Sequence, residues 1–292
     1  MRRSIVLAIA LLTALSLAIP VGAITKGGAP DDGEHPYVGL MVAYEDELID
    51  HDGDPETPER FAPLWRCSGS LISPTVFVTA GHCVGPESSA ADAATPALVG
   101  IWFDEDVEPA AAAGEYPWYE FAPVTGIPHP HPSYNPDAFF LYDMGVVVLD
   151  APVNTGQFAS LPDEGVVDTI GHGRKTATVE AVGYGLQNAN KNHEVALRQR
   201  MKADLFIVNR EGVVGLKQIF GFFPGSGSFI VSGDAANGGT CFGDSGGPML
   251  LGDSDVIVGV NSFGLNANCA GVGGAYRIDQ ADDLSFINSF LS

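Results

Sequence analysis

Short hydrophobic runs, separated by glycine, proline, asparagine and aspartate, recur along most of this 292-residue chain. Two examples are residues 76–78, Val-Phe-Val, and residues 144–149, Met-Gly-Val-Val-Val-Leu. Runs of this length that are rich in β-branched and aromatic residues and bounded by turn-forming residues are typical of strands. The pattern therefore predicts an all-β protein, a sandwich or a barrel, built from many short strands.

The C-terminal segment departs from the strand pattern. Four apolar residues there fall on one face of a helix: Leu284, Ile287, Phe290 and Leu291. Asp282 and Asp283 precede this face and are candidates for the helix cap. We therefore expect one helix at the end of the chain.

The N-terminal segment departs from the pattern in another way. Arg2 and Arg3 precede an apolar stretch over residues 5–18, and small residues, Val-Gly-Ala, follow at 21–23. A charged start, a short apolar region and a small-residue cleavage site are typical of a secretory signal peptide. The very short charged region favours Sec-type over twin-arginine export. No later segment is apolar for long enough to span a membrane, so we expect a secreted mature protein without a membrane partner.

Composition and charge narrow the class of protein. The length suffices for one large or two small cores, and 46% of the residues are hydrophobic, with 36 glycines and 20 prolines. The 36 acidic and 14 basic residues give a formal net charge of −22, which becomes −24 when Arg2 and Arg3 are removed with the signal peptide. Such a charge excludes binding to nucleic acid or anionic membranes by electrostatic attraction. It is compatible with a high-salt environment and equally with simple solubility.

Residues 243–248, Gly-Asp-Ser-Gly-Gly-Pro, are the strongest candidate for chemistry. A serine hydroxyl becomes a good nucleophile only beside a base, and the attacked carbonyl needs fixed N–H donors. Glycines around Ser245 allow the backbone to present the N–H groups of Gly243 and Ser245 to one oxygen. His82, in Thr-Ala-Gly-His-Cys at 79–83, is the candidate base, and Asp143 is the candidate carboxylate that orients it.

The order His82, Asp143, Ser245 and the three local patterns resemble the chymotrypsin/trypsin-like serine peptidase family, over nearly the whole chain after residue 23. Four shorter segments are also similar to the family: residues 131–135, His-Pro-Ser-Tyr-Asn; 183–185, Gly-Tyr-Gly; 262–264, Ser-Phe-Gly; and 274–276, Gly-Ala-Tyr.

The resemblance implies two packed six-stranded antiparallel β-barrels with a C-terminal helix, divided into residues 1–23 (signal peptide), 24–150 and 151–292. It implies a serine endopeptidase that acts on protein or peptide substrates, as a monomer, with no cofactor and no metal. Ser245 attacks, His82 transfers the proton, Asp143 holds His82, and Ser262 donates a hydrogen bond to Asp143. With an unperturbed histidine as base, activity is expected to fall as the pH drops through about 6.5.

Four cysteines, Cys67, Cys83, Cys241 and Cys269, allow three pairings from the sequence alone. The family resemblance selects Cys67–Cys83, beside the histidine, and Cys241–Cys269, in the wall of the specificity pocket. Free thiols are unexpected in a secreted chain, and the close Cys-x-x-Cys spacing of zinc sites is absent from the sequence.

Ile24, followed by Thr-Lys-Gly-Gly, resembles the family's activation terminus with one extra residue before the glycines. The resemblance implies that the freed α-ammonium of Ile24 pairs with Asp244, for which burial without a cation would be costly. Signal peptidase cleavage after Ala23 would then activate the enzyme directly. Two alternatives stay open: cleavage after Ala18, which leaves a pro-segment at 19–23, and Ile24 as simply the start of a strand.

By resemblance, the specificity pocket involves six residues: Gly239, Thr240, Ser262, Phe263, Gly264 and Gly274. Gly239 occupies the position at which an acidic residue, in other family members, selects substrates with arginine or lysine. Gly264 and Gly274 occupy the two positions in the pocket walls where larger side chains would narrow the pocket. These glycines predict an open, uncharged pocket. Such a pocket favours apolar or aromatic side chains at P1, the residue before the cleaved bond. Phe242 lies at its rim, and Asp234 is the nearest acid that could enter from another loop.

Three other segments receive no chemical role. The acidic loop with Asp50, Asp52 and Asp54 fails the EF-hand pattern and is expected to be a solvated surface loop. His129 and His131 belong to a proline-rich turn, and residues 87–114 form an insertion between His82 and Asp143. A catalytically silent binding homologue and a narrow regulatory protease remain the rival functions.

Overall fold

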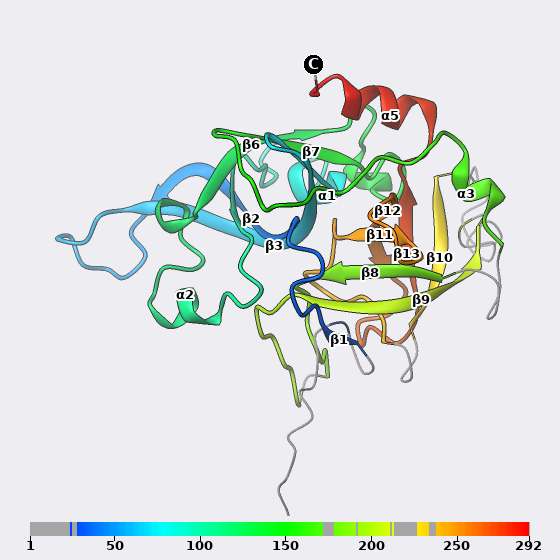
Figure 1. The fold of residues 1–292 in the computed structure, drawn as a ribbon. Coiled ribbons are helices and arrows are strands. Elements are labelled where there is room, and N and C mark those ends of the chain that lie inside the picture. The colour runs from blue at the N-terminus through cyan, green and yellow to red at the C-terminus, as the bar shows by residue number, and fades with distance from the viewer. Residues whose placement is uncertain are drawn as a thin grey trace, which may run out of the picture.

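The computed structural model describes residues 24, 28–171, 178–190, 192–210, 212, 227–233 and 238–291. The predicted signal peptide at 1–23 and Asp234 lie outside the described residues. Two β-barrels stand side by side, with the chain passing from the first into the second near residue 150 (Figure 1). The prediction of two six-stranded antiparallel barrels is confirmed.

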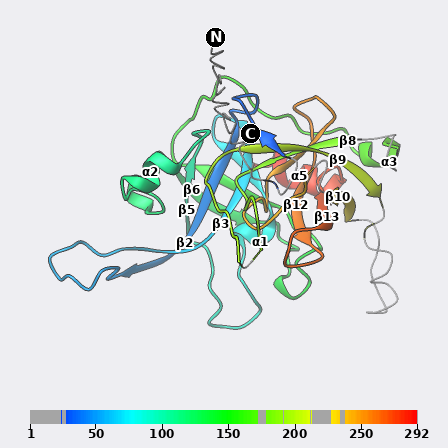
Figure 2. The same cartoon turned by 90° about the horizontal axis from the view of Figure 1, so that it is seen from below.

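The first barrel closes in the order β2-β3-β4-β7-β6-β5, and all its pairs are antiparallel. Its strands are β2 (Val38–Ile49), β3 (Arg60–Ser73), β4 (Val76–Thr79), β5 (Leu98–Trp102), β6 (Val124–Pro130) and β7 (Gly145–Leu149). The far ends of β2 and β3 extend well beyond the barrel as a long hairpin, whose tip is the acidic loop (Figure 2). Of the two strands that carry the apolar runs quoted above, β4 is fully buried, and β7 is buried except at Val148.

The second barrel has the order β9-β10-β13-β12-β11-β8 and closes through the pairing of β8 with β9. Its strands are β8 (Thr178–Gly183), β9 (Met201–Asn209), β10 (Ser228–Gly233), β11 (Pro248–Leu251), β12 (Ile257–Gly264) and β13 (Gly271–Arg277). A short strand from the start of the chain, β1 (Ala29–Pro30), adds to β9. The N-terminal segment is therefore attached to the second barrel, although the sequence assigns it to the first domain.

Among the residues that the structure describes, helical elements are few and short, as a chain of strands and turns predicts. They are α1 (Gly81–Val84), α2 (Glu108–Ala112), α3 (Val166–Thr169), α5 (Ala281–Asn288) and the 3-10 turns η1 (Tyr119–Phe121) and η2 (Pro136–Ala138). Within the described ranges, no helix combines the length and the apolar character needed to cross a membrane.

The C-terminal helix α5 packs on the first barrel, with Ile287 fully buried and Phe286 and Phe290 half-buried against the same core. Its cap differs from the expectation: Gln280 is the N-cap, and Asp282 and Asp283 lie in the first turn. Acidic residues there are favourable because they face the positive end of the helix dipole. Asp283 does not cap the helix; it is buried and accepts a hydrogen bond from the hydroxyl of Tyr276.

Candidate active site

His82 and Asp143 meet at one end of the first barrel. His82 lies in α1, directly after β4, and Asp143 lies two residues before β7, which pairs with β4. The Nδ1 atom of His82 is 2.9 Å from Oδ2 and 3.1 Å from Oδ1 of Asp143. The backbone N–H of His82 also donates to Oδ1 of Asp143, at 2.8 Å. The carboxylate therefore fixes both the backbone and the ring of His82.

Asp143 is fully buried, and the hydroxyl of Ser262 on β12 donates a hydrogen bond to its Oδ2. The sequence analysis expected this contact by resemblance. Burial lowers the pKa of His82, but the charge of Asp143 and its hydrogen bond to the ring outweigh burial and raise the pKa above 6.5. His82 is thus a stronger base than a free imidazole.

Ser245 follows the left-handed residue Gly243 (φ +98°) and precedes Gly246 (φ +79°), so the sequence has glycines where the turn needs them. The loop is tied to both barrels. The carbonyl of Ser245 accepts from the N–H of Ser68 on β3, at 2.7 Å, and the N–H of Gly246 donates to Asn261 on β12, at 2.8 Å. Two cavities, of about 570 and 450 Å³, are lined by both Ser245 and His82.

The peptide unit between Phe242 and Gly243 is oriented for anion binding. The carbonyl of Phe242 accepts from the N–H of Leu186 at 2.9 Å. In a trans peptide the N–H points opposite to the carbonyl, so the Gly243 N–H faces away from Leu186. Gly243 lines the 570 Å³ cavity together with Ser245. An N–H in this position is available to a substrate carbonyl.

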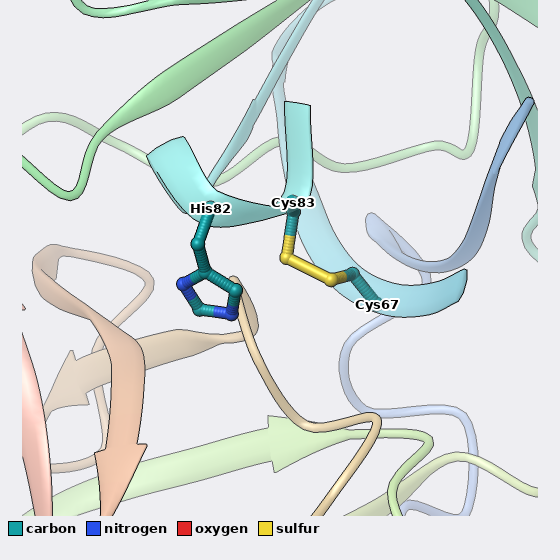
Figure 3. A group of neighbouring side chains, drawn as sticks. All are labelled: Cys67, His82 and Cys83. Carbon is teal, nitrogen blue, oxygen red and sulfur yellow. A yellow bond between two sulfur atoms is a disulfide. The ribbon is translucent and has the colours of Figure 1, made fainter. Parts of the chain in front are cut away.

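Two disulfides brace the site. Cys67–Cys83 joins β3 to α1, with a Cα–Cα distance of 6.1 Å, and Cys241–Cys269 joins the nucleophile loop to the start of β13, at 5.2 Å. These are the pairs that the family resemblance implies. Figure 3 shows the imidazole of His82 beside the Cys67–Cys83 bridge. This His–Cys–Cys group is the one cluster of potential metal ligands among the described residues. Both sulfurs are oxidised to the disulfide and offer no thiolate to a metal.

Comparison with known proteins agrees with this geometry. The family model described as Trypsin matches residues 59–284.

The chain belongs to the trypsin family.

Hypodermin-B of Hypoderma lineatum is 26% identical over 229 residues, which are 77% of this chain and 76% of that protein. A trypsin of Saccharopolyspora erythraea is 28% identical over 213 residues, 72% of this chain and 80% of the trypsin. The solved structure of HL collagenase has a TM-score of 0.59 at 22% identity and covers 91% of this chain and 98% of its own. That likeness shows the same fold. As a trypsin-family member, the protein is a serine-type endopeptidase that acts on proteins.

The 450 Å³ cavity beside Ser245 is lined by most of the residues predicted for the specificity pocket. Four of the six residues predicted for the pocket line it: Thr240, Ser262, Phe263 and Gly264. Phe242, expected at the rim, lines it too and is 58% exposed. Asn261 also lines the cavity. No sequence motif marks Asn261, which precedes the Ser-Phe-Gly segment; its place in the wall follows from its position on β12.

The other two predicted residues, Gly239 and Gly274, are covered by other parts of the chain. A Cβ atom on Gly239 would lie 2.8 Å from the Cα of Gly233, and a Cβ on Gly274 would lie 2.1 Å from the ring of Phe263. Gly274 was expected to leave the pocket open. The ring of Phe263 takes up that space, because β12 shifts its register against β13 between Asn261 and Phe263.

Ile24 and Asp244 are both buried. The Ile24 side chain packs in the core of the second barrel. Asp244 accepts hydrogen bonds from the N–H groups of Cys241 and Gly185, both at 2.8 Å. Burial raises the pKa of Asp244 to about 7, although these two N–H groups and the charge of Arg66 act in the opposite direction. The carboxylate therefore lies in a place where a cation would be strongly favourable.

The segments without an assigned role have structural explanations. Asp50, Asp52 and Asp54 lie in an exposed loop and accept hydrogen bonds from backbone N–H groups of that same loop. His131 follows strand β6, accepts from the N–H of Ser133 and stacks on Tyr142. The expectation that His129 also belongs to a turn is wrong, because His129 lies in β6 and pairs with Val146 of β7.

Proposed function

We propose that this endopeptidase works through the triad His82, Asp143 and Ser245. Ser245 Oγ attacks the carbonyl carbon of the peptide bond while His82 takes its proton, and His82 then gives that proton to the leaving amine. Asp143 holds the proton of Nδ1, so that Nε2 is free to act as the base. The N–H groups of Gly243 and Ser245 stabilise the oxyanion. Water then hydrolyses the acyl-enzyme.

The observation that carries this proposal is the double contact of Asp143 with the backbone and ring of His82, at the wall of cavities that Ser245 also lines. A buried carboxylate that orients one ring nitrogen leaves the other directed to the cleft. None of these steps requires a metal or an organic cofactor.

Covalent labelling tests the triad. A fluorophosphonate should label the wild-type enzyme at Ser245, with no label in Ser245→Ala and at least a 10³-fold slower reaction in His82→Ala. Ser254→Ala, which changes an exposed serine in a turn, is the matched control and should label like the wild type. Equal labelling of Ser245→Ala would rule out this assignment.

We further propose that the enzyme is exported by the segment at 1–23 and becomes active when cleavage after Ala23 frees Ile24. The buried, proton-holding Asp244 supports this, because an α-ammonium beside it would restore its charged form. N-terminal sequencing of the secreted enzyme checks the proposal. An active chain that begins at Ile24 agrees with it, and an inactive chain that begins at Ile19 contradicts direct activation.

The absence of an acid at Gly239 supports a preference for uncharged P1 side chains. Among these, the glycine positions of the sequence predict apolar or aromatic residues, and this stays a prediction.

A further inference from the structure

Asn261 has an unsatisfied side chain in the wall of the specificity pocket. The residue is 5% exposed, and its Oδ1 atom has no hydrogen-bond partner. In the described residues, two other buried side-chain atoms share this condition, those of Ser70 and Arg198, and neither residue lines the pocket. A buried polar atom without a partner destabilises the protein, so a ligand whose binding turns this buried amide oxygen or its N–H group toward the cavity and supplies the partner binds with a corresponding advantage.

The backbone of Asn261 is fixed directly behind the nucleophile. Its carbonyl accepts from Gly246 at 2.8 Å, and its N–H donates to Gly247 at 2.9 Å. On the other side, Asn261 pairs with Ala275 of β13. The backbone that carries this side chain therefore keeps a constant position relative to Ser245, as a residue that reads the substrate must.

Other polar residues line the pocket, but the side chains of Ser262 and Asn266 already have hydrogen-bond partners inside the protein. Thr240 contributes a hydroxyl, and apart from His82 the lining formed by the described residues holds no ionisable side chain. Gly239 and Gly274, which would deepen the pocket, are covered by Gly233 and by the ring of Phe263. The pocket is therefore ill suited both to a long cationic side chain and to a large aromatic one.

We propose that Asn261 determines specificity and selects P1 asparagine or glutamine, which are uncharged but polar, in place of the apolar or aromatic side chains that the glycine positions predict. The inference rests on the proposed function of Ser245. A carboxamide has one acceptor and two N–H donors, and a rotation of the Asn261 amide about its last bond offers either its oxygen or its N–H group. The amide of Asn261 and the amide of a P1 asparagine or glutamine can therefore pair so that the oxygen and the N–H group of Asn261 both have partners. A P1 hydroxyl provides a partner for one of these two groups at a time, and an alkyl side chain provides a partner for neither.

Peptides that differ only at P1 test this proposal. The wild-type kcat/KM should be at least about 10-fold higher for P1 glutamine or asparagine than for leucine or phenylalanine. Asn261→Leu keeps the size of the side chain and removes its hydrogen bonds, so the glutamine-to-leucine ratio should fall by about 10- to 100-fold. Asn268→Ala, at an exposed asparagine outside the pocket lining, is the control and should leave the ratio unchanged.

A wild-type enzyme that favours leucine or phenylalanine, or a ratio that Asn261→Leu does not change, overturns the proposal. Asn261→Asp gives a second test, because it keeps the shape of the side chain and its acceptor oxygen but removes the N–H donors. A carboxylate has no N–H group to donate to the P1 carboxamide oxygen, so kcat/KM for P1 glutamine and asparagine should fall by at least about 10-fold, and no fall would contradict a role for this side chain in the pocket. Fluorophosphonate labelling is run in parallel. A labelled enzyme with the wrong preference removes only this inference, whereas loss of labelling removes the proposed function.

Discussion

Replacing His35 should reveal a pH-dependent connection between the N-terminal segment and the second barrel. His35 is buried, and its Nδ1 lies 2.6 Å from Asp31 while its Nε2 lies 3.3 Å from Glu180 on β8. Asp31 also accepts from Arg200, directly before β9, at 2.8 Å. Tyr37 contacts the His35 ring edge-on. A protonated His35 therefore joins two carboxylates that belong to different parts of the chain.

The size of this effect follows from the proton affinity of the ring. Burial lowers the pKa of His35, but the hydrogen bonds and charges of Asp31 and Glu180 outweigh it and raise the pKa to about 9, against about 6.5 for a free imidazole. Each tenfold change in affinity is worth about 1.4 kcal/mol, so protonation of His35 stabilises the fold by about 3 kcal/mol. Because the folded-state pKa is the higher one, this contribution is complete below pH 6.5 and is lost as the pH rises through 9.

Urea unfolding between pH 6 and pH 10 measures the effect, in a Ser245→Ala background that prevents self-digestion. His35→Gln should lower the free energy of unfolding by about 2–3 kcal/mol at pH 6 and by less than about 1 kcal/mol at pH 10. His193→Gln, at an exposed histidine, is the control and should show no such trend. A loss of stability in His35→Gln that is the same at both pH values would refute the reasoning.

Three further predictions concern catalysis. Because Asp143 raises the pKa of His82, kcat/KM should fall with decreasing pH around a midpoint above 6.5, and a midpoint at or below 6.5 in a pH–rate profile would contradict this. Asp143→Asn should lower kcat by about 10⁴-fold at pH 7, as in the family template, with little change in folding; a steady-state assay showing less than 10-fold loss would exclude its orienting role. Gly243→Ala should lower kcat by about 10²–10³-fold with a smaller change in KM. A Cβ on this residue, at φ +98°, would lie 3.1 Å from Arg66 Nε and from Gly185 Cα, and would displace the Gly243 N–H. An unchanged kcat would count against this oxyanion site.

The sequence predicts those parts of the molecule that depend on local chemistry. Strand runs such as residues 76–78 appear as buried strands, since β-branched residues bounded by turns have few other solutions. The glycines at 243 and 246 are needed for left-handed backbone, and the structure has them there. The disulfide connectivity could not be predicted from the cysteine positions alone, because these allow three pairings, and the family resemblance was needed to select one of them.

The features that the sequence missed depend on how distant strands meet. The addition of β1 to β9 joins residues far apart in the chain, and no local pattern marks it. The register shift between Asn261 and Phe263 is a property of two strands together. This shift places the ring of Phe263 over Gly274 and the amide of Asn261 in the pocket wall. Gly274, which predicts an open space from the sequence, is therefore covered in the structure.

The most direct test of the account is the mass of the acyl-enzyme. The enzyme is mixed with a p-nitrophenyl ester, quenched in acid within milliseconds, and measured as intact protein and as peptides. The triad predicts one added acyl group, located on Ser245, with a matching burst of nitrophenol and no adduct in Ser245→Ala. An acyl group on another residue, or peptide hydrolysis that persists in Ser245→Ala, would contradict Ser245 as the nucleophile.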